Sequence, residues 1–265
     1  MTATIECHEL TRTFGANTAL DHLTISIDGP GVIGVLGPNG AGKTTLMRLL
    51  TTALAPTTGN AHIAGHDITR DPVAVCRHIG FSAETVPLPG DARAGELLEL
   101  VGRLRGLDRR DARHRSDDVL DQVGLAGFAR RRVAELSKGQ RQSVGLATAL
   151  IGDPPVLLLD EPTAGLDPEQ VVATRALITD LARDHTVLFS SHLLNEVESI
   201  CDRVLIIDRG RRLADHTITD LRAELGLAPT LITQTSALTD DDADLVRASA
   251  AHGRLPEGTA VRIGG

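Results

Sequence analysis

Residues 37–45, with the sequence Gly-Pro-Asn-Gly-Ala-Gly-Lys-Thr-Thr, constrain this chain more than any other segment. They follow the G-x-x-x-x-G-K-T pattern of a phosphate-binding loop, between an apolar run at 32–36 and a helical pattern at 46–50. Glycines let the backbone curl so that its N–H groups surround an anion at a helix N-terminus. A plain glycine turn is the alternative. The full pattern and both flanks instead predict a loop that binds a nucleoside triphosphate.

This loop and a later strand end supply the candidate catalytic and metal-binding groups. Lys43 offers a positive charge to the β- and γ-phosphates, and the Thr44 hydroxyl is a candidate Mg²⁺ ligand. Asp160 is a candidate Mg²⁺ ligand, directly or through water, and Glu161 is a candidate general base for the attacking water. Two strand-end acids facing solvent are the alternative. The predicted nucleotide-binding residues of the loop are Gly37, Pro38, Asn39, Gly40, Ala41, Gly42, Lys43, Thr44 and Thr45.

Apolar runs that alternate with helical patterns predict an α/β fold built on a P-loop NTPase core. Residues 5–10 and 23–27 alternate like the strands of an N-terminal antiparallel β subdomain. Continuous apolar runs at 156–159 and 186–189 are typical of buried parallel strands, and the pattern at 170–183 predicts a crossover helix between them.

The remaining segments predict an insertion, a hairpin and a C-terminal addition. Residues 88–150 are mostly helical in pattern, which predicts a helical insertion subdomain. Residues 204–208 and 211–216 predict a second hairpin with a turn at Arg209-Gly210. The predicted domains are a nucleotide-binding domain over 1–227 and a small α+β appendage over 228–265.

Composition narrows the possible partners. The net charge of −8 argues against general nucleic-acid binding, and the absence of Trp and Tyr argues against a base-stacking surface. No apolar stretch approaches the roughly 18 residues of a membrane span, and the N-terminus lacks a signal-peptide pattern, so a membrane role requires a partner. Cys7, Cys76 and Cys201 are predicted to be reduced thiols packed as small apolar groups.

Four further motifs follow the loop in order: residues 136–140 (Leu-Ser-Lys-Gly-Gln), residues 160–161 (Asp-Glu), residues 164–167 (Ala-Gly-Leu-Asp) and residues 190–192 (Ser-Ser-His). Alone, the first of them is a capping box that starts a helix. Together with the loop, the set resembles the ATP-binding subunit of ABC transporters over about residues 1–215. Lys138 replaces one glycine of that family's L-S-G-G-Q signature.

The resemblance implies that two copies close head to tail around ATP. The γ-phosphate bound to one copy would meet signature residues of the other, namely Ser137, Gly139 and Gln140. His192 matches the switch histidine, which would act with Lys43 and Glu161 in catalysis. Asp167 matches an aspartate that couples the two sites. A surface histidine and a turn aspartate are the alternatives for these last two residues.

Two residues depart from the family pattern. Phe14 stands where an aromatic residue, often tyrosine, stacks on adenine, and a core phenylalanine is the alternative. Glu84 stands where a Mg²⁺-binding glutamine is expected, unless the alignment is shifted by one residue. A carboxylate there keeps a metal ligand but adds negative charge beside Asp160 and Glu161. We therefore expect weaker ATP binding or a stronger dependence on Mg²⁺.

The resemblance also implies an integral membrane permease as partner and a location at the cytoplasmic face of the membrane. The sequence resembles subunits of ABC-2 exporters for drugs, antibiotics, lipids or polysaccharides. A soluble ABC ATPase in translation or DNA repair is the alternative, but its second nucleotide domain or coiled-coil insertion is not seen, nor is the N-K-x-D motif of GTPases. A role in contacting the permease or anionic lipid is one hypothesis for the arginines of the insertion, but the aspartates between them favour an ordinary solvated face. The arginines are Arg103, Arg105, Arg109, Arg110, Arg113, Arg115 and Arg130–Arg132.

Overall fold

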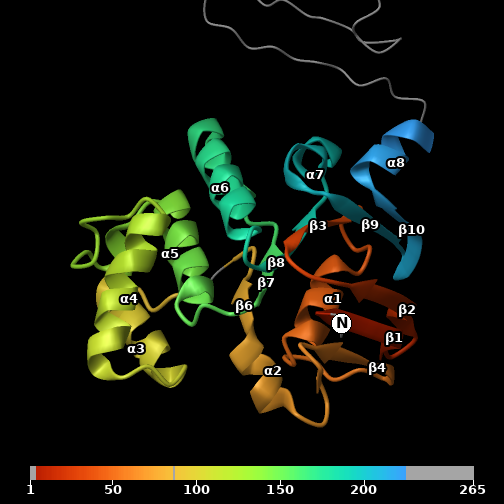
Figure 1. Ribbon diagram of the computed structural model, residues 1–265, viewed down its shortest axis with the longest axis horizontal. Coiled ribbons are helices and arrows are strands. Elements are labelled where there is room, and N and C mark those ends of the chain that lie inside the picture. Colours follow the sequence, from red (N-terminus) through yellow and green to blue (C-terminus); the bar gives the residue numbers. More distant parts are fainter. Residues whose placement is uncertain (1–3, 86, 225–265) are drawn as a thin grey trace, which may run out of the picture. The chain divides into compact units, whose positions relative to one another are not determined.

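The computed structural model describes residues 4–85 and 87–224 (Figure 1). Its contacts divide the chain into two compact units, residues 1–215 and residues 216–265. Strand β10 (Arg211–Thr217) ends in the second unit and is followed by α8 (Ile218–Glu224). The predicted appendage over 228–265 lies outside the described residues, so the domain boundary after residue 227 stays a prediction.

An antiparallel sheet with the order β2-β1-β4-β5 contains the N-terminal strands. Strand β1 (Ile5–Phe14) pairs with β2 (Asn17–Ile27), and Ile5 lies opposite Ile27. The predicted hairpin is confirmed, and its strands are longer than predicted because residues 12–14 also pair with β2. The other strands of this sheet are β4 (Thr58–Ile63) and β5 (His66–Asp67).

The second sheet has six strands in the order β10-β9-β3-β8-β7-β6, and the pairs from β9 to β6 are parallel. Every residue of β7 and β8 is buried, which explains their continuous apolar sequences. Leu36 lies opposite Ser191 and Asp160 opposite Ser190, so the carboxyl ends of three strands meet at one edge. The strands are β3 (Gly31–Leu36), β6 (Ile79–Ser82), β7 (Val156–Asp160), β8 (Thr186–Ser191) and β9 (Arg203–Asp208).

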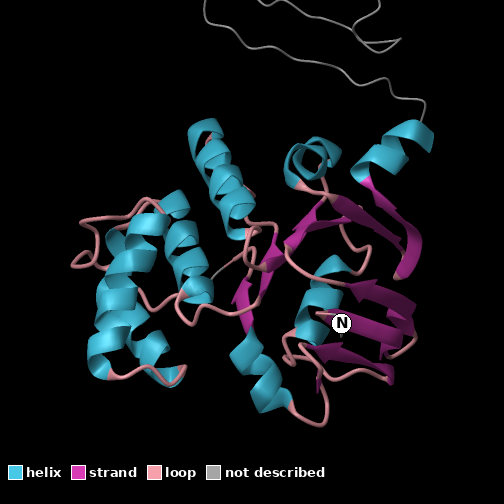
Figure 2. Ribbon diagram, in the orientation of Figure 1, coloured by secondary structure: helices cyan, strands magenta, loops and turns pink. Residues whose placement is uncertain are grey.

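Helices separate β6 from β7, which confirms the predicted helical insertion. Figure 2 shows these helices as a group beside the sheets. They are α3 (Ala94–Leu104), α4 (Arg109–Gln122), the 3₁₀ helix η1 (Val133–Glu135) and α5 (Lys138–Leu150). The other helices of the first unit are α1 (Lys43–Leu50), α2 (Pro72–His78), the predicted crossover helix α6 (Pro168–Leu181) and α7 (Leu194–Ile200).

Helix α1 packs between the two sheets and thereby fixes the loop that precedes it. It contacts β2 and β4 of the antiparallel sheet and β7 of the parallel sheet. Its apolar side chains belong to the hydrophobic core that both sheets share, and each is fully buried: Leu46, Met47, Leu49 and Leu50. Burial of one such side chain contributes about 1.5–3 kcal/mol, so this end of the loop is firmly held.

Two of the three cysteines are core residues. Burial raises the pKa of the Cys7 and Cys201 thiols to about 12, so both remain protonated at neutral pH. Gly34 of β3 faces Cys201, because a Cβ atom at Gly34 would lie 2.9 Å from its sulfur. The prediction that Cys76 packs as an apolar group is wrong. Cys76 is exposed on α2, and its sulfur lies 3.5 Å from the Thr52 hydroxyl.

Within the residues that the structure describes, no helix combines the length and the apolar character needed to cross a bilayer.

Candidate active site

The phosphate-binding loop joins β3 to α1, and its glycines meet specific backbone requirements. Gly40 and Gly42 have φ angles of 82° and 112°, in the region that side chains disfavour. A Cβ atom at Gly42 would lie 2.6 Å from the carbonyl oxygen of Ala19. At Gly37 it would lie 2.2 Å from the carbonyl oxygen of Ile207. The loop can therefore pack against β2 and β9 only with glycine at these positions.

Lys43 begins α1, and its ammonium group lies under the loop. The side chain is only 6% exposed. Its Nζ donates hydrogen bonds to the carbonyl oxygens of Gly37 at 2.7 Å and Pro38 at 3.3 Å. The same atom lies 3.5 Å from Oε1 of Glu161. These contacts place a buried positive charge beside the loop and next to the candidate base.

Glu161 follows β7 and connects Lys43 to the switch position. Its other carboxylate oxygen lies 2.9 Å from Nδ1 of His192, and its φ of 48° is unusual for a residue with a side chain. The Glu161 N–H donates to the Ser190 hydroxyl at 3.0 Å, and that hydroxyl donates to Asp160 at 2.6 Å. Both acids are buried, which excludes the alternative of two solvent-facing carboxylates.

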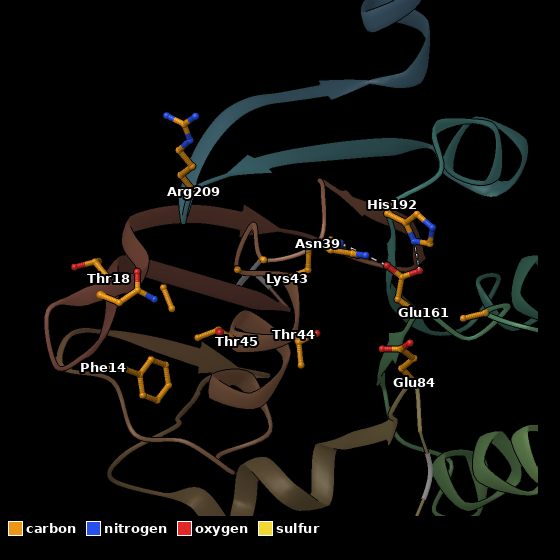
Figure 3. A pocket seen from close by; sticks show the side chains of 15 residues that line it. Phe14, Thr18, Asn39, Lys43, Thr44, Thr45, Glu84, Glu161, His192 and Arg209 are labelled. Atoms are coloured by element: carbon orange, nitrogen blue, oxygen red, sulfur yellow. Dashed lines mark hydrogen bonds and ion pairs between the residues drawn. The ribbon is translucent and has the colours of Figure 1, made fainter.

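Lys43, Glu161 and His192 line a cavity of about 810 Å³ (Figure 3). Glu84, Glu161 and His192 lie on one side, Phe14 lies on the other, and Lys43 lies between them. Phe14 is 45% exposed, so it is not a core residue. The full lining is Phe14, Asn17, Thr18, Ala19, Asn39, Gly40, Gly42, Lys43, Thr44, Thr45, Glu84, Glu161, Ala164, His192 and Arg209.

Several of these lining residues were not predicted from the sequence. Arg209, at the β9–β10 turn, and the β2 residues 17–19 match no motif, and only the pairing of β1 with β2 and the order of the second sheet bring them to the loop. A role for Arg12 was not predicted either, although its guanidinium carbon lies 4.5 Å from the centre of the Phe14 ring. A cation two residues before an aromatic residue in a strand was the only available signal.

The signature residues lie away from this cavity within one copy of the chain. Ser137 begins α5, where its hydroxyl accepts from the Gln140 N–H at 3.2 Å and its N–H donates to the Gln140 side chain at 3.0 Å. Asp167 begins α6 and accepts from the Gln170 N–H at 2.9 Å. Gly139 packs against the Gln170 side chain, which a Cβ atom would meet at 1.9 Å. Locally, each of these residues has a structural role at or near a helix start.

The cavity has the features of a site for a nucleoside triphosphate bound with a divalent cation. The loop, with its inward-curled glycines and buried ammonium, suits an anionic phosphate chain. The Thr44 hydroxyl and two carboxylates lining the cavity supply oxygen ligands of the kind that Mg²⁺ prefers. The described residues contain no group of three His, Cys, Asp or Glu side chains able to hold a metal ion by themselves.

Comparison with protein families tests whether the chain belongs to the family that its motifs resemble. A family model described as ABC transporter matches residues 20–164. The chain belongs to the ABC transporter family. As the ATP-binding type of subunit in that family it is an ATPase, which confirms the assignment made from the motif order.

Relatives of this ABC transporter subunit include proteins named for drug and antibiotic transport. It is 41% identical to the daunorubicin resistance ATP-binding protein DrrA3 of Streptomyces coeruleorubidus, over 80% of this chain and 68% of that protein. It is 36% identical to the bacitracin transport ATP-binding protein BcrA of Bacillus licheniformis, over 84% of this chain and 72% of that protein. A solved ATP-binding subunit of an ABC transporter superposes with a TM-score of 0.77 at 27% identity, over 92% of this chain and 99% of the other.

Proposed function

We propose that this chain binds and hydrolyses ATP to drive a separate integral membrane permease in export, at the cytoplasmic face of the membrane. The observation that carries the proposal is the contact of Glu161 with both Lys43 and His192 beside the phosphate loop. The names of relatives support drugs or antibiotics as the exported class. The predicted alternative of a soluble ABC ATPase has no comparable support.

We assign one role in the reaction to each of the following groups. The loop N–H groups and Lys43 hold the β- and γ-phosphates, and Phe14 stacks on adenine. Mg²⁺, when bound, neutralises charge on the phosphate oxygens, and Thr44 and Glu84 are its ligands. Glu161 takes a proton from the attacking water, while His192 orients that water at the γ-phosphate.

Asp160 is not among the residues that line the cavity. Its side chain is buried and accepts the hydroxyl proton of Ser190, which also receives the Glu161 N–H. This chain of hydrogen bonds fixes the backbone of the candidate base. Asp160 would help to hold Mg²⁺, directly or through water.

A second copy of the chain supplies the other half of the site. The start of α5 carries Ser137, Gly139 and Gln140 and offers the positive end of a helix dipole. These residues do not line the cavity of their own copy. In the proposed head-to-tail closure they would contact the γ-phosphate of the partner. Asp167, at the start of α6, would then lie between the two sites.

Co-purification tests the coupling to a membrane partner. Chain extracted with detergent from membranes of its native host should bring down one integral membrane protein, and ATP hydrolysis by that complex should exceed hydrolysis by the chain alone. The Lys43→Met variant is the control for ATPase activity from contaminants. Recovery of the chain with ribosomes and not with membranes would contradict the proposal.

Replacement of Glu84 by Gln tests the unusual charge in the cavity. We expect Glu84→Gln to tighten ATP binding about two- to fivefold at low Mg²⁺ concentration, because one negative charge near the phosphates is removed. The expected difference shrinks as Mg²⁺ is raised. Titration of a fluorescent ATP analogue at several Mg²⁺ concentrations measures this effect, with Glu84→Asp as the control that keeps the charge. Identical affinities at every Mg²⁺ concentration would refute the idea.

A further inference from the structure

A buried carboxylate outside the cavity connects the two loops that carry the catalytic pair. Glu196, on α7, is only 5% exposed. Its Oε1 accepts a hydrogen bond from the Thr163 hydroxyl at 2.8 Å, and its Oε2 accepts one from the Ser191 hydroxyl at 2.6 Å. The Arg175 guanidinium of α6 also donates to Oε1, at 3.3 Å. These four residues are called the Glu196 network below.

The two hydroxyl groups of the Glu196 network belong to residues that lie close in sequence to Glu161 and His192. Thr163 comes two residues after Glu161, and Ser191 comes directly before His192. Glu161 and His192 touch each other at 2.9 Å in the cavity. Glu196 therefore holds, behind the cavity, the same two loops that meet inside it.

The network also explains why a charged group is buried here. A carboxylate withdrawn from water is costly unless donors surround it, and apolar residues of similar volume often serve stability as well or better. Glu196 has three donors, from α6, from the loop after β7 and from the end of β8. The Ser191 hydroxyl in turn accepts the Leu193 N–H at 3.1 Å, so the turn at His192 is fixed on both sides.

We propose that Glu196 is a positioning residue for ATP hydrolysis, which aligns Glu161 and His192 through Thr163 and Ser191. The proposal rests on the ATPase function proposed above. Glu196 is buried and is not among the residues that line the cavity. Its loss should therefore affect the rate of the chemical step and spare the binding of ATP.

The Glu196→Gln variant tests this role, because an amide has one acceptor oxygen and cannot receive both hydroxyl groups and the guanidinium. We expect kcat to fall about 10- to 100-fold, as for a small misplacement of reacting groups, while KM and the Kd for a fluorescent ATP analogue stay within about twofold. Ser199→Ala is the matched control, because its hydroxyl bonds the Glu196 backbone carbonyl on the same helix and not the carboxylate. That variant should keep wild-type kcat.

A second pair of variants covers the case in which Glu196→Gln does not fold. Thr163→Val removes one hydroxyl of the network and should lower kcat, whereas Thr163→Ser keeps the hydroxyl and should restore it. A kcat for both Glu196→Gln and Thr163→Val within about twofold of Ser199→Ala would overturn the proposal, as would an equal loss of ATP affinity and kcat. Absence of hydrolysis by the wild-type chain would instead overturn the proposed function, and this inference with it.

Discussion

Replacing Glu161 by Gln is expected to lower kcat for ATP hydrolysis by about 10²–10⁴-fold and to leave ATP bound. The amide keeps the size of the side chain and can still contact His192, but it cannot accept a proton from water. Removal of the negative charge 3.5 Å from the Lys43 ammonium also frees that ammonium for the phosphates. Since hydrolysis would reopen the site, the variant should accumulate as an ATP-bound dimer.

Two measurements separate these effects. Phosphate release gives kcat, and size-exclusion chromatography with Mg²⁺-ATP gives the fraction of dimer. Glu99→Gln, on α3 in the helical insertion, is the control for loss of one carboxylate elsewhere. Hydrolysis at the wild-type rate by Glu161→Gln would remove this residue from its role, and a monomer with bound ATP would argue against closure by two copies.

Replacing Lys43 by Met should abolish hydrolysis and weaken ATP binding by roughly 10- to 150-fold. A hydrogen bond to a charged group contributes about 1.5–3 kcal/mol, and this affinity range is its equivalent. Methionine fills the same buried space along the side chain but cannot donate to the loop carbonyl oxygens of Gly37 and Pro38. The lost binding would then reflect the missing charge together with these two hydrogen bonds.

Equilibrium titration with a fluorescent ATP analogue measures the change in affinity. Arg48→Met is the matched control, because this exposed cation lies on the same helix and outside the cavity lining. Circular dichroism verifies that both variants are folded. An affinity of Lys43→Met equal to that of the control would show that the ammonium group does not hold the phosphates.

The sequence predicted the segments whose pattern is local and strong. The phosphate-binding loop needs particular residues at fixed spacing, and strands β7 and β8 are apolar throughout because both of their faces are buried. Residues 51–78 showed no such pattern. Strand β4 is polar at Thr58 and Asn60 and forms by pairing with β1, so its partner and not its own sequence determines it.

Some residues of the candidate site were likewise predictable from local motifs, and others were not. Motif spacing identified Lys43, Glu161 and His192 singly, and their mutual contacts required the order of the strands in space. Glu196 carries no motif, and its position on a helix surface after the switch histidine gave no sign of burial. Its hydrogen-bond donors come from α6, from the loop after β7 and from the end of β8, and only the folded chain brings these segments together.

The order of the parallel sheet has a consequence for synthesis of the chain. Among the described strands, β3, which leads into the phosphate-binding loop, pairs with β8 and β9, whose residues 186–191 and 203–208 come much later in the sequence. During translation the loop therefore leaves the ribosome long before the strands that support it. A nascent chain that ends before β8 should not retain ATP, so nucleotide binding would begin only after β8 and β9 have joined the sheet.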